Sequence, residues 1–212
     1  MARETGSVCK KCRREGIKLF LKGTRCDSNA CSMKRREGVG PGMHGSKRGK
    51  ITDYAVHLRE KQKVKTYYGV LERQFRKYYQ MAERAKGNTG KVLMSLLERR
   101  LDNVVYRLKF ATSRSAARQL VSHGHILVNG RRVDIASYLV KPGDCIAVKN
   151  RPASIKLVKE SQEIAASIPG SIPEYLLDNK TEIPSGNVLR APVADDVSLE
   201  VQPQLIVELC SK

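Results

Sequence analysis

The sequence contains no tryptophan and only three phenylalanines among its 212 residues. It also has no apolar run that approaches the roughly 20 residues of a membrane-spanning helix. An amphipathic surface helix rich in Trp and Phe is absent as well, so we expect no membrane partner. The N-terminal residues MARETGSVCKKC lack the apolar segment of a secretory signal. We therefore expect a chain that is not secreted and whose cysteines are reduced.

Acidic residues are scarce: 21 Asp and Glu stand against 40 Lys and Arg, which gives a formal net charge of +19. Basic residues outnumber acidic ones by 14 to 4 in residues 1–50, 12 to 5 in residues 51–100 and 8 to 3 in residues 101–150. Residues 151–212 reverse the balance, with 6 basic and 9 acidic residues. A positive field of this extent attracts large polyanions such as nucleic acids. A solvated charged surface is the plainer interpretation, but it leaves the shortage of matching acids unexplained.

Four of the six cysteines form two pairs with thirteen residues between the pairs: Cys9, Cys12, Cys26 and Cys31. Each pair can place two thiolates on one side of a turn, and two such turns can surround one zinc ion tetrahedrally. The segment has few apolar residues, so it needs a cross-link in order to fold. Two disulfides, an iron–sulfur cluster and four unrelated thiols are the alternatives. Cys145 and Cys210 are expected to be packing residues.

Apolar residues at helical spacing predict helices over residues 53–86, with a break at Gly69. A second run, from Leu93 to Leu108, predicts one continuous helix, and Thr89 is the expected N-cap before it. The first of these regions carries many basic residues on its exposed faces. These helices therefore combine a structural role with a cationic surface.

The pattern changes between residues 113 and 148. Ser113 can cap a short helix over 114–123, and Gly124 can end it. Alternating apolar residues around Asn129-Gly130 then predict a tight hairpin, and 145–148 predicts another strand. Three further elements are predicted after residue 150, namely a helix over 154–166 and strands over 197–201 and 205–209.

The predicted fold is α+β and combines a zinc-bound N-terminal segment, a helical domain and an inserted small helix-helix-hairpin domain that binds RNA. The expected parts are a cysteine-rich segment with a basic loop (1–50), a helical RNA-binding region (51–96), the small RNA-binding domain (97–160) and a C-terminal segment (161–212). The C-terminal segment is expected to pack back on the helical region.

Residues 96–144, LLERRLDNVVYRLKFATSRSAARQLVSHGHILVNGRRVDIASYLVKPGD, resemble the RNA-binding domain of the family of small-subunit ribosomal protein number four. The resemblance extends to the cysteine pairs and to GPGMHG, LREKQKVKTYYGVLERQFRKYY, NTG, IPEYL and DDVSLEVQPQLIVE. It covers nearly the whole chain and implies the bacterial or organellar form. Some members of the family lack the four cysteines, whereas this chain has all of them, so one structural zinc ion is expected.

The resemblance implies a non-enzymatic constituent of the small ribosomal subunit, located in cytoplasmic or organellar ribosomes. Members of the family bind a helical junction in the 5′ domain of the ribosomal RNA first and nucleate assembly of the subunit body. They also contact ribosomal protein number five, lie near the channel that messenger RNA enters and influence translational accuracy. Two alternatives are a non-ribosomal zinc-containing RNA-binding protein and an accessory RNA-binding chain of an RNA-modifying enzyme.

Basic and polar residues at matching positions are the candidate RNA contacts. Arginine forks bind phosphate through two hydrogen bonds and stack on unpaired bases, so arginines of the short helix and hairpin are preferred. The residues expected to bind RNA are Lys47, Arg48, Lys50, Arg59, Lys61, Lys63, Lys65, Arg73, Arg76, Lys77, Arg114, Arg118, His123, His125, Asn129, Arg131 and Arg132. No catalytic residue is expected.

Overall fold

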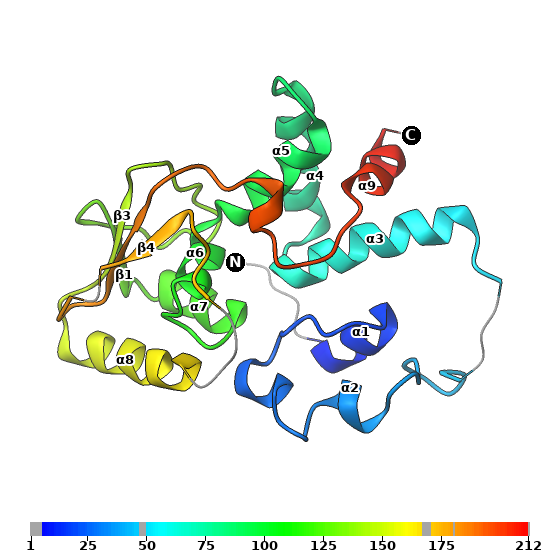
Figure 1. Cartoon of the computed structure of the whole chain (residues 1–212), viewed down its shortest axis with the longest axis horizontal. Helices are drawn as coiled ribbons and strands as arrows, with labels where there is room; N and C mark the ends of the chain where they lie inside the picture. The colour runs from blue at the N-terminus through cyan, green and yellow to red at the C-terminus, as the bar shows by residue number, and fades with distance from the viewer. Residues whose placement is uncertain (1–5, 47–49, 167–170, 180, 212) are drawn as a thin grey trace. The chain divides into compact units, whose positions relative to one another are not determined.

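The computed structural model describes residues 6–46, 50–166, 171–179 and 181–211. The chain divides into two compact units (Figure 1). The first unit consists of Met1–Met94 and Leu199–Lys212, and the second of Ser95–Ser198. Among the described residues, no helix is both long and apolar enough to cross a membrane.

The N-terminal part of the first unit contains three short helices: α1 (Val8–Glu15), the 3-10 helix η1 (Gly23–Cys26) and α2 (Ser32–Arg35). Gly16 ends α1 in the left-handed conformation, with φ of 73°. Leu19, which follows this turn, is fully buried. This segment thus contributes only a few buried apolar side chains besides its cysteines.

Four further helices are α3 (Asp53–Tyr68), α4 (Glu72–Arg84), α5 (Thr89–Glu98) and α9 (Pro203–Cys210). The residues of α5 from Ser95 onward already belong to the second unit. The predicted break at Gly69 is confirmed, and its φ of 62° is one that glycine adopts at little cost. The N-cap prediction was wrong, because Thr89 is already helical and the Asn88 side chain accepts the bond from Lys91 N instead. Each of the first three helices carries a fully buried apolar side chain, namely Val64 on α3, Phe75 on α4 and Leu93 on α5.

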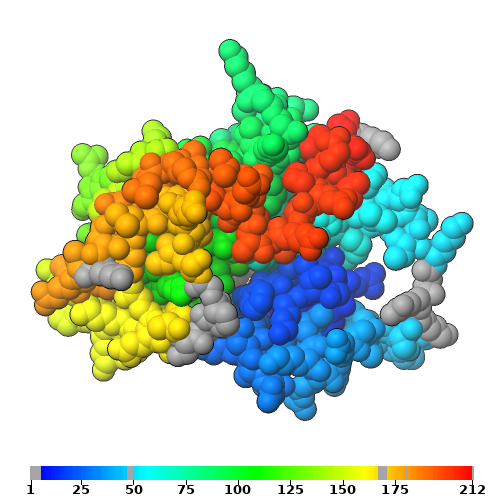
Figure 2. Space-filling model, in the orientation of Figure 1, coloured from blue at the N-terminus to red at the C-terminus, as the bar shows by residue number. Residues whose placement is uncertain are grey.

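The prediction of a strand over residues 205–209 is wrong, because these residues lie in helix α9. Pro203 occupies the first turn, where its missing N–H costs nothing, and Ile206 is fully buried. The helix packs against α3, as the red and cyan atoms show (Figure 2). The backbone N–H of Gln202 donates to Glu60 Oε1 over 2.8 Å, which fixes the start of α9 beside α3.

The helix predicted from Leu93 to Leu108 is instead two helices, α5 and α6 (Leu101–Arg107). Arg100 lies between them in an extended conformation and forms an isolated bridge with Leu139. Leu101 N also donates to the carbonyl of Tyr138 over 2.9 Å. Backbone pairing with the 138–140 segment therefore replaces the helical hydrogen bonds at this point.

The second unit contains a five-stranded antiparallel sheet in the order β2-β1-β3-β5-β4. Its elements are α6, α7 (Arg114–Ser122), β1 (Ile126–Val128), β2 (Arg131–Arg132), β3 (Cys145–Val148), α8 (Pro152–Ala166), β4 (Leu176–Asp178), β5 (Ser185–Val188) and the 3-10 helix η2 (Ala194–Asp196). The hairpin at Asn129-Gly130 and the Ser113 cap of α7 are confirmed. Helices α6 and α7 enclose one apolar core together with the buried face of the sheet.

Two strands of this sheet, β4 and β5, were not predicted from the sequence. The β5 sequence Ser-Gly-Asn-Val has little of the β-branched composition that marks a strand. A Cβ at Gly186 would lie 2.6 Å from Leu108 Cδ2 and 2.9 Å from the backbone oxygen of Leu177, so a side chain there would force its neighbours to move. The strand predicted over 197–201 was wrong, since these residues lie outside the named strands and helices.

Candidate nucleic-acid interface

The four N-terminal cysteines line one small cavity of about 10 Å³, which has no room for a substrate molecule. All four are free thiols. Cys12 and Cys26 are buried, and burial raises the pKa of both thiols, although backbone N–H groups of Leu19 and Lys22 that bond to the sulfurs oppose this effect. The bond from Lys22 N to Cys26 Sγ is 3.3 Å long.

These thiols fit a structural zinc ion in kind and number, because four sulfurs from two turns are its usual donor set. Within the ranges that the structure describes, no group of three or more His, Cys, Asp or Glu side chains is placed so that it could hold a metal ion, so the fit of the thiols is one of kind and number and not of position. Residues Cys9, Cys12, Cys26 and Cys31 would hold the ion, which would cross-link α1 to the segment that leads into α2.

The predicted RNA-binding cations of α3 are already paired with carboxylates of the same unit. Lys61 and Lys65 each lie 2.6 Å from an oxygen of Glu72, which also accepts from Arg76 Nε over 3.1 Å. Burial alone would raise the pKa of Glu72, but these three hydrogen bonds outweigh it and lower the pKa to about 2. Two further pairs in this region are Lys63 with Glu60 and Arg59 with Glu15.

Other predicted cations of the first unit are exposed. Arg73 and Lys77 project from α4, and Lys50 precedes α3. The predicted contacts Lys47 and Arg48 lie outside the described residues. The exposed residues have the access to solvent that a phosphate contact requires.

The expectation that Arg114 is an exposed phosphate ligand does not fit the structure. Arg114 is 8% exposed, its Nε donates to Asn103 Oδ1 over 2.9 Å, and its guanidinium lies 4.5 Å from the centre of the Tyr106 ring. The Asp102 carboxylate accepts from the buried Arg100. Arg114 therefore joins α7 to α6 inside the second unit.

Asn103 extends this arrangement to a second buried charge. Its Nδ2 donates to Glu98 Oε2 over 2.6 Å, and Glu98 also accepts from Arg107 and from the Tyr175 hydroxyl. Burial is the main reason why the pKa of Tyr175 is raised far above its usual range. The network fixes α6, α7 and the segment before β4 relative to one another.

The end of α7 and the start of β1 border a cavity of about 170 Å³ that includes His123, His125, Leu120 and Leu157. His123 is exposed, whereas His125 is half-buried and lies 2.9 Å from Ser154 Oγ through Nδ1. Burial, followed by the positive charge of nearby residues, lowers the pKa of His125. A neutral imidazole in this position can accept or donate a hydrogen bond and can stack on a base.

The hairpin presents two exposed arginines, Arg131 and Arg132, on β2. Arg132 lies over Gly124 and forms an ion pair of 3.8 Å with the exposed Asp134. Asn129 is exposed, but its side-chain amide is engaged within the protein, since it donates to Asp144 Oδ1 and accepts from Cys145 N, both over 2.8 Å. Arg118 of α7 is half-buried.

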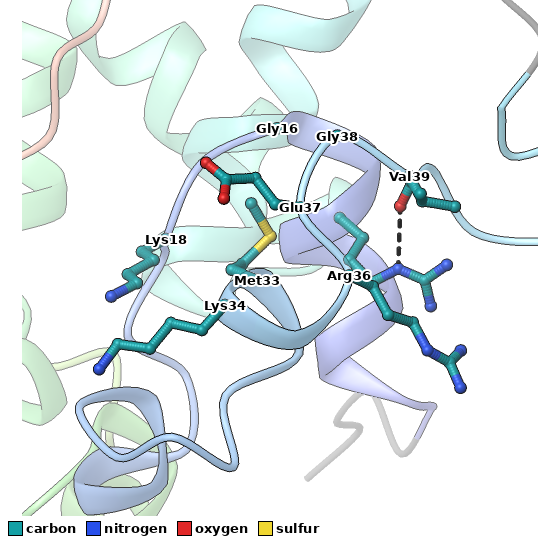
Figure 3. Close-up of a pocket in the computed structure, with 9 residues that line it drawn as sticks. Gly16, Lys18, Met33, Lys34, Arg36, Glu37, Gly38 and Val39 are labelled. Atoms are coloured by element: carbon teal, nitrogen blue, oxygen red, sulfur yellow. Dashed lines mark hydrogen bonds between the residues drawn. The ribbon is translucent and has the colours of Figure 1, made fainter.

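A second basic site was not anticipated from the sequence. Four cationic side chains of the N-terminal segment, Arg13, Lys18, Lys34 and Arg36, line a cavity of about 530 Å³ (Figure 3). Their abundance is visible in the sequence, but nothing in their spacing predicts a common cavity. It forms because the chain reverses direction between α1 and α2.

Comparison with known proteins identifies two family matches along the chain. Residues 3–98 match the family described as "Ribosomal protein S4/S9 N-terminal domain", and residues 99–146 match the "S4 domain" family. The chain is 53% identical to "Small ribosomal subunit protein uS4" of Thermoanaerobacter sp. (strain X514) and 53% identical to "Small ribosomal subunit protein uS4A" of Symbiobacterium thermophilum. It is 51% identical to the uS4 protein of Geobacter sp. (strain M21). Each of these matches covers 100% of both chains.

Proposed function

The chain belongs to the small ribosomal subunit protein uS4 family, and from this premise we propose that it is a structural constituent of the small ribosomal subunit that binds ribosomal RNA. The observation that carries the proposal is the identity of 53% over the full length of proteins bearing that name. The cationic surfaces of both units support it, because RNA is often recognised through its backbone and shape.

The two units contribute differently to binding. In the second unit, the buried bonds among Glu98, Asn103 and Arg114 hold α6 and α7 in a fixed relation. The exposed Arg131 and Arg132 and the half-buried Arg118 then reach the RNA from a rigid scaffold, which lowers the entropic cost of binding. The role is that of a structural RNA-binding protein and not of an enzyme.

We further propose that the RNA target is a helical junction in the 5′ domain and that binding nucleates assembly of the subunit body. Contacts with ribosomal protein number five and with messenger RNA near its channel, and an influence on accuracy, complete the proposed role. The supporting observation is the family membership across the whole chain. The proposed location is the ribosome of the cytoplasm or of an organelle.

One zinc ion is proposed as the structural cross-link of the N-terminal segment. The four thiols around one cavity support it, as does the small number of buried apolar side chains nearby. Four thiolate ligands complete a tetrahedron, so the ion would have no open position for chemistry. Zinc would supply folding energy to this segment.

A competition experiment tests the proposed function. A ribosomal RNA fragment that contains the junction should displace a labelled copy of itself from the protein far better than an unstructured RNA of equal length. Affinity should fall steeply as salt is raised, because bound cations release the counterions of the phosphates. Equal competition by the two RNAs would leave only nonspecific charge attraction and would contradict the proposal.

A further inference from the structure

We propose that Asn129 is a site of spontaneous deamidation and that the folded hairpin holds this reaction back. Asn129-Gly130 is the only Asn-Gly pair in the sequence. Asparagine is among the chemically labile residues of proteins, and it reacts most readily before glycine, because no side chain then hinders the backbone nitrogen that attacks it. The inference goes beyond the proposed function, since it concerns a covalent change of the chain itself.

The reaction needs water and no other partner. The backbone nitrogen of Gly130 loses its proton to hydroxide and forms a bond to Cγ of Asn129, while the Cγ–Nδ2 bond breaks and Nδ2 leaves as ammonia. The product is a five-membered succinimide ring. Water then adds to one of the two ring carbonyls and opens the ring to aspartate or isoaspartate. In the net reaction, one amide and one water become one carboxylate and one ammonium ion.

Solvent has access to this pair of residues. Both Asn129 and Gly130 are exposed at the tip of the hairpin between β1 and β2. Hydroxide can therefore reach the Gly130 N–H, ammonia can leave, and water can open the ring. Since burial does not protect Asn129, its protection must come from its conformation.

Three hydrogen bonds hold Asn129 to residues 144 and 145, where β3 begins. Its Nδ2 donates to Asp144 Oδ1 and its Oδ1 accepts from Cys145 N, both over 2.8 Å. Its backbone N–H donates to the carbonyl of Cys145, also over 2.8 Å. Both polar atoms of the side-chain amide are therefore directed toward this segment. Cγ can approach Gly130 N only after the two side-chain bonds break.

The backbone of the turn is fixed as well. Asn129 has a φ of 50° and Gly130 a φ of 77°, and the flanking residues Val128 and Arg131 are paired across the hairpin. Closing the succinimide ring requires rotation about the backbone bond of Asn129 that leads to Gly130, and this pairing opposes the rotation. Deamidation therefore proceeds from molecules in which the hairpin is open, through either local or global unfolding.

Deamidation is expected to keep the hairpin from closing as before. Asp144 is 8% exposed and accepts a hydrogen bond from Lys141 N besides the one from Asn129. A carboxylate at position 129 replaces the amide donor by a negative charge that faces this buried carboxylate. Isoaspartate also adds a backbone atom to the two-residue turn. The hairpin carries Arg131 and Arg132, so RNA binding would weaken too, and this consequence alone rests on the proposed function.

Incubation of the full chain with and without denaturant tests both parts of the proposal. In guanidinium chloride and mildly alkaline buffer, peptide mass spectrometry should find deamidation at Asn129 about tenfold or more faster than at Asn150, which is exposed but followed by arginine. Under native conditions the rate at Asn129 should fall by about tenfold or more, because only the open fraction reacts. Equal rates at the two asparagines in denaturant would refute the site. Equal rates at Asn129 with and without denaturant would refute its protection.

Two acidic residues provide matched variants that test the bond to the amide. Asp144→Ala removes the acceptor of Asn129 Nδ2, whereas Asp134→Ala removes an exposed carboxylate that pairs with Arg132 instead. In folded protein, deamidation at position 129 should be about tenfold faster in Asp144→Ala than in wild type, and less than about twofold faster in Asp134→Ala. Circular dichroism verifies that both variants are folded. If Asp144→Ala does not fold, the wild-type comparison with and without denaturant decides the question.

The Asn129→Asp variant imitates one product of the reaction. It should unfold at a lower denaturant concentration than wild type, because two carboxylates then face each other in the hairpin. Adding Asp144→Asn should recover part of this loss, since an amide at position 144 can donate to the carboxylate at position 129. Recovery would support the proposed effect of deamidation on the hairpin. An Asn129→Asp protein as stable as wild type would contradict it.

Discussion

Arg114 and Asn103 are joined inside the second unit by a hydrogen bond of 2.9 Å from the guanidinium Nε to the amide oxygen. Arg114 begins α7 and Asn103 lies on α6, so the bond connects the two helices of the small RNA-binding scaffold. The amide nitrogen of Asn103 bonds in turn to the fully buried Glu98. The position of α7 thus depends on buried polar contacts as well as on apolar packing.

Replacing Arg114 is expected to destabilise the second unit. In Arg114→Ala the buried Asn103 oxygen loses its donor and Tyr106 loses the cation above its ring, at a combined cost of about 2–4 kcal/mol. Arg114→Glu should cost more, because it places a second negative charge near Glu98. Urea denaturation followed by circular dichroism measures the free energy of unfolding.

Arg118→Glu is the matched comparison on the same helix. Arg118 is half-buried, whereas Arg114 is buried, so we expect Arg118→Glu to change the free energy of unfolding by less than about 1 kcal/mol. RNA affinity and its salt dependence should decrease. An Arg114→Ala protein as stable as wild type but unable to bind RNA would show that Arg114 contacts RNA directly. It would contradict the structural role.

Glu72 should make the stability of the first unit depend on pH. Its pKa is lowered from 4.5 to about 2 because three cations donate to it, so the folded state binds this proton less readily than the unfolded chain. The stabilisation is present above pH 4.5 and is lost as the pH falls toward 2. Unfolding free energies of wild type and Glu72→Gln should therefore differ at pH 6 and converge near pH 2. A difference that stays constant over this range would be inconsistent with the three hydrogen bonds.

Asn129 offers a test of the hairpin. Its φ of 50° lies in the left-handed region, and its amide bonds to the buried Asp144 and to Cys145 N. Asn129→Gly keeps the backbone conformation but loses the two bonds, and should cost about 1–2 kcal/mol. Asn129→Ala should cost about 1 kcal/mol more, because alanine also strains the turn. If both variants unfold like wild type, the amide bonds do not stabilise the hairpin.

Metal removal tests the N-terminal cross-link. Purified protein should contain about one zinc per chain, and a chelator should make residues near α1 and α2 susceptible to proteolysis. Cys12→Ser should lower the zinc content sharply, whereas Cys145→Ser on β3 should not change it. A metal-free, reduced protein with a protease-resistant N-terminus would show that zinc is not required.

Much of the helical architecture could be predicted from the sequence, because the apolar periodicity of α4 and α7 agrees with their burial. In α3 the helix was predicted, but the buried residues are Val64, Tyr67 and Tyr68 and not the exposed Tyr54. The break at Gly69 and the Asn129-Gly130 hairpin followed from residues that favour left-handed backbone conformations. The division between α5 and α6 could not be foreseen, since it arises from pairing of Arg100 with Leu139, which lies far away in sequence. Strand β5 was missed for the same reason, as its sheet partners and not its composition make it a strand.

The site was harder to predict than the fold. A count of cations finds the basic regions, but it cannot distinguish Arg114, whose charge is buried, from Arg131 and Arg132, which are exposed. A count of charges also cannot predict which cations form ion pairs, as Lys61 and Lys65 do with Glu72. The cavity between α1 and α2 depends on a chain reversal that brings residues 13 and 36 to the same site.

Sedimentation of the protein with small ribosomal subunits tests the central claim most directly. A tagged chain expressed in cells should migrate with the small subunit on a sucrose gradient, near one copy per particle, and should stay bound after a wash in high salt. Retention at high salt is expected because a structural constituent makes many specific contacts besides charge attraction. Release of the protein into the free fractions by the wash would contradict the assignment as a structural constituent of the subunit.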